Sequence, residues 1–129
     1  MSELEKLTIN LTPVDLGKIE LLVEQGFYAN RAEFIRAAIG SELDRHDDTV
    51  KAVTTRESVV IGAMRLSRAS LEKLRKARKA PLAVSVVGFL SIGDDVSPEL
   101  ARQTIASLHV RGIFRASQTV KEALADRMQ

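Results

Sequence analysis

The first regular pattern along the chain is a strict alternation of polar and apolar residues over residues 6–12. In a β-strand, Leu7, Ile9 and Leu11 would share one face and the polar side chains would share the other. No second strand follows nearby, and an isolated strand of this length is not stable in water. We therefore expect residues 6–12 to pair with the same segment of a second copy, so that the chain is an obligate homodimer.

Two helices are predicted after this strand. Thr12-Pro13 is typical of a helix start, because threonine caps exposed amides and proline fits the first helical position. Apolar residues at helical spacing continue to Gly26, which favours a helix end. A second helix is predicted from Asn30, where Glu33 stands three residues later in a variant of the capping box. The apolar face of this helix consists of Phe34, Ile35, Ala38, Ile39 and Leu43.

Residues 5–46 resemble the ribbon-helix-helix repressors of the MetJ/Arc/CopG type. The resemblance rests on the alternation of Lys6, Thr8 and Asn10, on the Thr-Pro helix start and on the turn that leads to Asn30. The most specific part is the stretch Asn-Arg-Ala-Glu-Phe-Ile-Arg at residues 30–36. The resemblance implies a β-α-α unit that forms an intertwined dimer and binds double-stranded DNA.

The outward face of the predicted ribbon carries side chains suited to base recognition. A two-stranded ribbon fits the major groove, where its outer side chains meet base edges. Lys6 would donate to guanine, Asn10 would pair with adenine, and Thr8 would bond a base or touch a thymine methyl group. We expect these three residues to read the DNA sequence.

Phosphate contacts are expected at the start of the second helix. Free amides and the positive end of the helix dipole suit an anion there. The resemblance implies that Asn30 and Arg31 hold a backbone phosphate, which fixes register without reading sequence. Tyr28 lies beside them and either adds a hydroxyl contact or packs in the turn.

The second half of the chain contains a weak internal repeat. Three β-like runs are centred on Gly62, Gly88 and Gly112, at spacings of 26 and 24 residues. Each glycine is followed twelve residues later by a leucine: Leu74, Leu100 and Leu124. This pattern predicts three strand–helix units with a solenoid-like parallel sheet. The alternative is a swapped-order α/β sandwich of the ACT type, which requires two strands in direct succession.

The expected fold class is therefore α+β, with three segments. Residues 1–47 would form the ribbon-helix-helix domain, residues 48–57 a polar linker, and residues 58–129 a small α/β domain. In the α/β domain, the glycine-bearing face of the sheet is expected to pack on the helices. The opposite face would expose an apolar stripe, formed by Ile61, Val87, Phe89 and Ile113. We expect self-association through this stripe, with a different protein partner as the alternative.

Charge is distributed unevenly between the two halves. The net charge of +2 combines ten acidic and five basic residues in 1–49 with seven acidic and fourteen basic residues in 50–129. A predicted helix at 68–79 carries six basic residues and one acid. It is either an auxiliary contact to the DNA backbone or a solvated face. The residues that would make such contacts are Arg75, Lys76, Arg78 and Lys79.

Several classes of function are not supported by the sequence. There is no cysteine, His46 and His109 stand far apart without neighbouring ligands, and the glycines sit singly within strands. We therefore expect no metal site, no cofactor and no enzymatic activity. No apolar run is long enough to span a membrane and no signal peptide is recognised, so we expect a cytoplasmic, nucleoid-associated protein without a membrane partner.

The sequence thus predicts a bacterial-type transcriptional regulator, a repressor that assembles further through its C-terminal domain. Two alternatives remain open. One is a DNA-organising or partition protein whose main output is assembly. The other is the antitoxin of a toxin–antitoxin pair, although the strand-rich second half differs from the disordered tail usual in antitoxins.

Overall fold

A helix, α3 (Asp47–Arg56), occupies nearly all of the segment that the sequence suggested as a polar linker, residues 48–57. Its charges match the helix dipole, since Asp47 and Asp48 lie in the first turn and Arg56 lies in the last. The Lys51 ammonium is 2.9 Å from the Asp47 carboxylate one turn away, and this hydrogen bond raises the pKa of Lys51.

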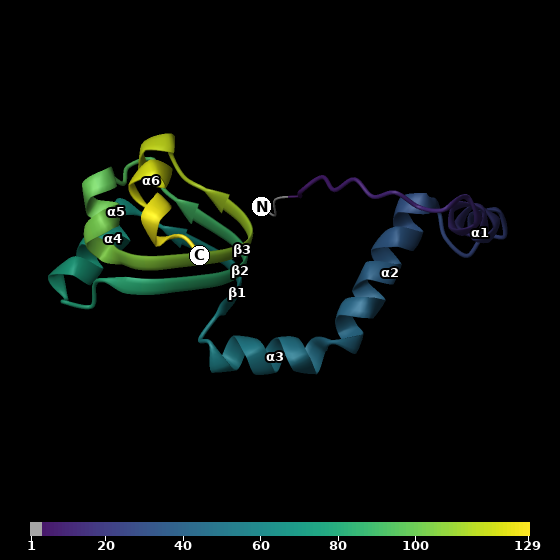
Figure 1. Ribbon diagram of the computed structural model, residues 1–129, viewed down its shortest axis with the longest axis horizontal. Coiled ribbons are helices and arrows are strands. Elements are labelled where there is room, and N and C mark those ends of the chain that lie inside the picture. Colours follow the sequence, from purple (N-terminus) through teal and green to yellow (C-terminus); the bar gives the residue numbers. More distant parts are fainter. Residues whose placement is uncertain (1–3) are drawn as a thin grey trace. The chain divides into compact units, whose positions relative to one another are not determined.

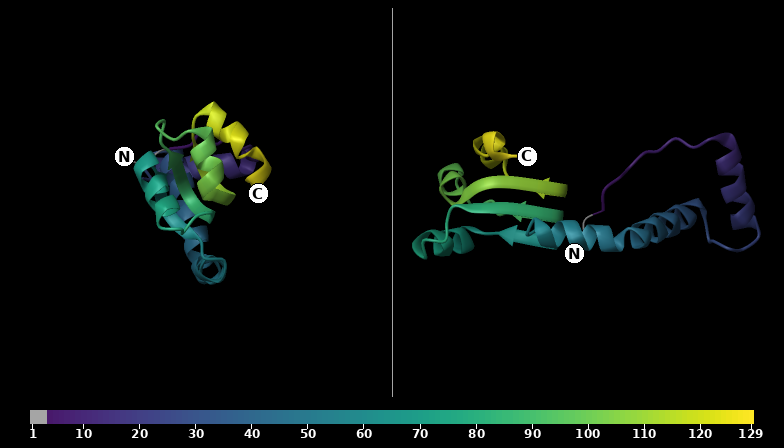
Figure 2. Two further views of the ribbon diagram at one scale, coloured as in Figure 1. Left: turned by 90° about the vertical axis from the view of Figure 1, so that its left-hand side faces the viewer. Right: turned by 60° about the horizontal axis from the view of Figure 1, so that its bottom comes forward.

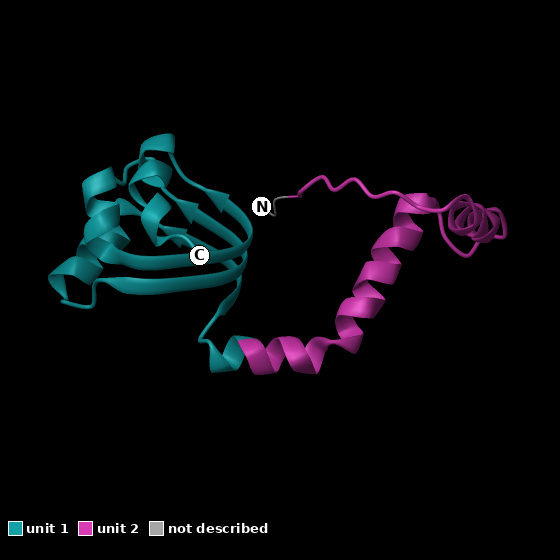
Figure 3. Cartoon of the chain, in the orientation of Figure 1, with its two compact units in different colours: residues 1–3, 54–129 teal, residues 4–53 magenta. Residues whose placement is uncertain are grey.

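The computed structural model describes residues 4–129, which divide into two units, residues 4–53 and residues 54–129 (Figure 3). The division falls within α3.

The first unit consists of an extended segment, residues 4–12, followed by α1 (Pro13–Glu24) and α2 (Arg31–Arg45) (Figure 1). Both helices begin with the predicted side-chain caps. The Thr12 hydroxyl accepts from the Asp15 amide at 3.2 Å, and the Asn30 side-chain oxygen accepts from the Glu33 amide at 2.9 Å. Gly26 has a φ of +85°, which explains why a glycine follows α1. Residues 6–12 are extended but form no β-ladder within the described chain, so their pairing remains a prediction.

The second unit alternates strands and helices. Its elements are β1 (Val60–Leu66), α4 (Arg68–Lys76), β2 (Leu82–Ile92), α5 (Pro98–Thr104), β3 (Ile105–Arg115), α6 (Gln118–Ala123) and the short 3₁₀ helix η1 (Ala125–Arg127). The strands lie side by side in the order β1-β2-β3, and both pairs are parallel (Figures 1 and 2). A helix follows every strand, so the predicted strand–helix units are confirmed, and the ACT-type alternative, with two strands in succession, is wrong.

The three repeat glycines stand in one row across the sheet. Gly62 pairs with Gly88, and Gly88 pairs with Gly112. Each has a φ between +126° and +133°, a region that side chains disfavour. A Cβ atom at Gly88 would lie 2.2 Å from the Gly62 carbonyl oxygen, and one at Gly112 would lie 2.0 Å from the Gly88 carbonyl oxygen. A Cβ atom at Gly62, in the edge strand β1, would have no neighbouring atom within 4 Å.

The core of the second unit lies on the glycine-bearing face of the sheet, as predicted. Buried strand residues of that face, such as Val86 and Leu90, form one cluster with buried residues of the helices. The helices and their flanking residues contribute Leu71, Val96, Leu100, Ala101, Val120 and Leu124. The repeat therefore marks core positions. Ser67, Ser97 and Ser117 are the N-caps of α4, α5 and α6.

Arg102 and Arg127 connect the last residues of the second unit to α5 and to the start of β3. The Arg102 guanidinium donates to the Asp126 carboxylate at 3.1 Å and to the Ala123 carbonyl oxygen. The hydrogen bond from Arg102 lowers the pKa of Asp126. Arg127 donates to the Ile105 carbonyl oxygen at 2.6 Å, at the start of β3.

Candidate nucleic-acid interface

The predicted base-reading residues lie on the extended segment that precedes α1. Lys6, Thr8 and Asn10 are all exposed, and they alternate with Leu7, Ile9 and Leu11. Leu7 is 80% exposed and Ile9 is 53% exposed, although both are large apolar residues. The segment therefore leaves both its polar and its apolar residues uncovered within one chain.

The first unit has almost no core of its own. Among residues 4–53, Ile19 is the one buried hydrophobic residue. A hollow of about 490 Å³ opens where the extended segment faces the two helices, and its apolar lining comes from Ile9, Leu11, Leu16, Ile19, Ala32 and Ile35. Further apolar side chains are bare on α1 and α2, including Leu21, Ile39 and Leu43. Uncovered apolar surface of this extent is typical of a unit that folds against a partner.

The N-terminus of α2 holds the residues expected to contact phosphate. The Asn30 side chain serves as the helix cap. The Arg31 side chain is 61% exposed, and its guanidinium is 3.7 Å from the Glu20 carboxylate. The Tyr28 ring packs edge-on against Phe34, with centroids 5.1 Å apart. Packing is thus the role of Tyr28 that the structure displays, while Arg31 is exposed at the helix start.

The four basic residues predicted to contact a DNA backbone lie in the last turn of α4 and directly after it. Arg75 donates to the Gln103 side chain at 2.7 Å, which ties α4 to α5. Lys76, Arg78 and Lys79 are exposed. These four cations remain the predicted auxiliary contacts to a DNA backbone.

The sheet face opposite the glycines is apolar at one end and polar at the other. Ile61 is 58% exposed, and Val87, Phe89 and Ile113 are half-buried. The apolar stripe was predicted from the sequence, but the polar end was not. There the register places Ser85 beside His109 and Ala83 beside Ser107. The alternation of Ser107, His109 and Arg111 along the chain was the available signal.

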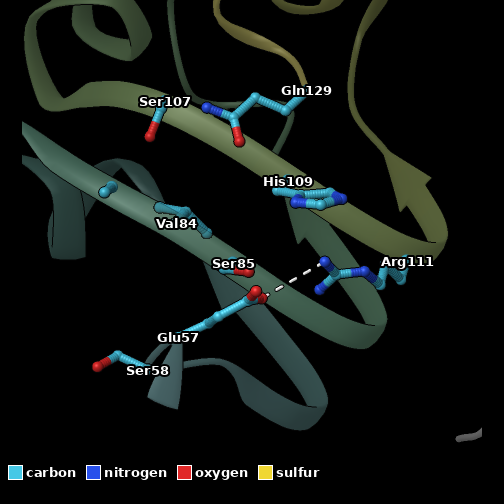
Figure 4. A pocket seen from close by; sticks show the side chains of 9 residues that line it. Glu57, Ser58, Val84, Ser85, Ser107, His109, Arg111 and Gln129 are labelled. Atoms are coloured by element: carbon cyan, nitrogen blue, oxygen red, sulfur yellow. Dashed lines mark hydrogen bonds and ion pairs between the residues drawn. The ribbon is translucent and has the colours of Figure 1, made fainter. Parts of the chain in front are cut away.

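The polar end forms a second hollow, of about 450 Å³ (Figure 4). Glu57 and Ser58 border it where α3 leads into β1, and β2 and β3 supply most of the remaining lining. The Glu57 carboxylate is 3.5 Å from the Arg111 guanidinium.

Within residues 4–129, no group of three or more histidine, cysteine, aspartate or glutamate side chains is arranged to hold a metal ion. None of the helices described here is both long enough and apolar enough to cross a membrane.

Comparison with known proteins places these features in a family. No solved structure matches the chain. A 49-residue stretch is 33% identical to the transcriptional regulator CdrS of Halobacterium salinarum, covering 38% of this chain and 89% of that protein. This relative is archaeal and gives no support to the expected bacterial origin. The model of the Ribbon-Helix-Helix transcriptional regulator family matches residues 2–121, far beyond the 5–46 segment that carries the resemblance in sequence. The match spans both units, and the chain belongs to the Ribbon-Helix-Helix transcriptional regulator family.

Proposed function

We propose that this protein is a sequence-specific transcriptional repressor that reads the major groove with a dimeric β-ribbon. The observation that carries the proposal is the extended segment 6–12, which exposes an apolar row and a polar row on alternate residues. Two such segments paired in an antiparallel ribbon would bury the apolar rows against the bare faces of α1 and α2. The polar rows would then face outward together.

The chemistry of the outward row supports base recognition. Lys6 donates to the acceptors of guanine, and Asn10 forms a paired contact with adenine. Thr8 supplies a hydroxyl and a methyl group between them. Because each segment contributes three side chains, the dimer presents a symmetric reader for two half-sites. Asn30 and Arg31, with Tyr28 beside them, would fix the ribbon on the phosphates.

Selection of bound DNA from a random pool tests this reading. We expect the unmodified chain to select a palindromic site, and Lys6→Ala and Asn10→Ala each to relax the preference at one base pair per half-site. Each variant should lose about 1–3 kcal/mol of discrimination at that position. Arg36→Ala serves as a matched control, because Arg36 pairs with Glu33 on the surface of α2 and should leave the selected site unchanged.

Two results would count against the proposal. If Lys6→Ala and Asn10→Ala bind more weakly but select the same site, the bases are read elsewhere. If the unmodified chain selects no site, a DNA-organising protein fits better than a repressor, and broad rather than focused occupancy of the genome would accompany that result.

We propose further that the second unit joins ribbon dimers into larger assemblies. The supporting observation is the apolar stripe formed by Ile61, Val87, Phe89 and Ile113, in which Ile61 is 58% exposed and the other three side chains are half-buried. Assembly would raise the effective concentration of one dimer next to another on adjacent half-sites. The basic α4 would add attraction to the DNA backbone beside them.

Phe89→Asp tests this assembly. Phe89 is half-buried in the middle strand, so a carboxylate there would have to be desolvated in any interface that covers the stripe. Light scattering of the full chain should then change from a tetramer or larger species to a dimer, while Ala106→Asp, at an exposed position near the start of β3 that is not part of the stripe, should leave the mass unchanged. A dimeric mass for the unmodified chain would contradict the proposed assembly.

A further inference from the structure

The hollow at the polar end of the sheet gathers hydrogen-bonding groups from separate elements. Ser107, His109 and Arg111 occupy alternate positions of β3 and therefore point to the same face. Ser85 of β2 stands opposite His109 in the parallel register. Figure 4 shows these side chains around one space. Glu57, the residue directly after α3, also lines this space. The arrangement depends on strand pairing, so chain positions far apart in sequence meet in it.

The polar side chains of the hollow are largely uncommitted. Within the described chain, Ser85, Ser107 and His109 make no side-chain hydrogen bond, and all three are half-buried. They offer two hydroxyl groups and an imidazole to an incoming molecule. A space of about 450 Å³ is within the range of small-molecule sites.

The hollow contains one guanidinium that an anion can bind. Arg111 presents a planar guanidinium, which pairs with carboxylate or phosphate oxygens in two parallel hydrogen bonds. Its present partner is Glu57, at 3.5 Å, and the two side chains are 43% and 45% exposed. An ion pair this long and this exposed contributes little to stability, so a ligand oxyanion would replace Glu57 at small cost.

We propose that this hollow binds a small polar organic anion, a carboxylate or a phosphate monoester. The oxyanion of the ligand accepts hydrogen bonds from the Arg111 guanidinium. The polar remainder of the ligand hydrogen-bonds to His109, Ser85 and Ser107. Glu57 is displaced from Arg111 when the ligand enters. Among the described side chains that line the hollow, Glu57 bears the one carboxylate, so it is the side chain that competes with the anion for Arg111.

The position of Glu57 suggests that a ligand in this hollow regulates DNA binding. This part of the proposal rests on the proposed function as a DNA-binding regulator. Glu57 directly follows α3, and α3 carries the chain from residues 4–53 into residues 54–129. A ligand that releases Glu57 from β3 therefore acts at the covalent connection between the two units. Such a ligand biases DNA binding only if its affinity differs between the DNA-bound and free states of the chain.

The binding claim is tested on the full chain without DNA. Amide resonances are followed by NMR during titration with inorganic phosphate, glycerol phosphate or succinate, each against sodium chloride at matched ionic strength. We expect saturable shifts confined to the neighbourhood of residues 57, 85, 107, 109 and 111, and the tightest probe identifies phosphate or carboxylate as the preferred head group. Shifts that do not saturate, or that chloride reproduces, would overturn the site.

Variants assign the roles of the charged groups. Arg111→Gln should weaken binding by about tenfold or more, because a charge-assisted pair is lost. Arg65→Gln is the matched control, since Arg65 is an exposed arginine of β1 that does not line the hollow. Glu57→Gln should tighten binding several-fold by removing the competing carboxylate. Equal affinity for the unmodified chain and Arg111→Gln, or weaker binding by Glu57→Gln, would contradict the proposed geometry.

A second readout separates the site from its regulatory role. DNA affinity of the full chain is measured with and without the tightest probe at constant ionic strength. A change that Arg111→Gln abolishes supports an effector site. Saturable binding of the probe with unchanged DNA affinity would overturn the regulatory role, and failure of DNA binding itself would count against the proposed function while leaving the anion titration decisive for the hollow.

Discussion

Gly88→Ala is expected to destabilise the second unit strongly. The new Cβ atom would lie 2.2 Å from the Gly62 carbonyl oxygen, which is backbone and cannot move aside without breaking the β1–β2 pairing. The alanine would also have to adopt a φ of +133°. Strained backbone and overpacking each cost about 1–3 kcal/mol, so the free energy of unfolding should fall by about 2–6 kcal/mol. Urea unfolding of the full chain, followed by circular dichroism, measures this loss.

Gly62→Ala is the matched control for this prediction. Gly62 has nearly the same φ, +126°, but a Cβ atom there meets nothing within 4 Å. The free energy of unfolding of Gly62→Ala should therefore fall only by the cost of the strained backbone, about 1–3 kcal/mol. Gly112→Ala should resemble Gly88→Ala, because its Cβ would lie 2.0 Å from the Gly88 carbonyl oxygen. Equal losses at Gly62 and Gly88 would show that the row of carbonyl groups is not what excludes a side chain.

Ile9→Asp is expected to separate the proposed dimer and remove most DNA binding. Ile9 lies on the apolar row of the extended segment and lines the hollow between that segment and the helices. In a paired ribbon this carboxylate would be buried without a partner, which opposes association. Because two linked half-sites bind about 10²–10⁴ times more tightly than one, DNA affinity should fall by about that factor. Light scattering measures the dissociation, and fluorescence anisotropy with the selected DNA measures the affinity.

Thr8→Ala provides the comparison on the opposite row of the same segment. It should leave the dimer intact and change only the preferred DNA sequence, because Thr8 is expected to face the groove. A dimer that persists in Ile9→Asp would contradict pairing through residues 6–12. Loss of the dimer in both variants would mean that the two rows do not have separate roles.

The elements that the sequence predicted well are those marked by local chemistry. Thr12 and Asn30 cap helices because their side chains reach amides three residues ahead, which needs no tertiary contact. The glycine period identified the three strands because the same row of close carbonyl groups recurs in the folded sheet. Alternation of side chains also identified the core face correctly.

Other features could not be predicted in this way. The polar segment at 47–56 lacks a sustained apolar period. Its helix is favoured instead by charges that match the helix dipole and by the Asp47–Lys51 ion pair, and apolar periodicity does not reveal either of these. The hollow beside Arg111 depends on the register between β2 and β3, because only that register brings Ser85 next to His109. The base-reading ribbon is a property of two chains, so the sequence names its residues but a single chain does not display it.

The row of paired glycines has a consequence for how such a protein grows over evolution. Each strand meets the next with glycine opposite glycine, and the paired positions lie 26 and then 24 residues apart in the chain. Neighbouring repeats therefore present nearly the same surface to one another, as in solenoid proteins. Duplication of one whole strand–helix repeat would lengthen the sheet with its row of glycines unbroken, whereas an insertion within a strand has to be absorbed by a local irregularity, like the register shift between Leu82 and Ala83, for that strand's glycine to stay in line. Changes in the length of this unit should accordingly come in steps of one repeat.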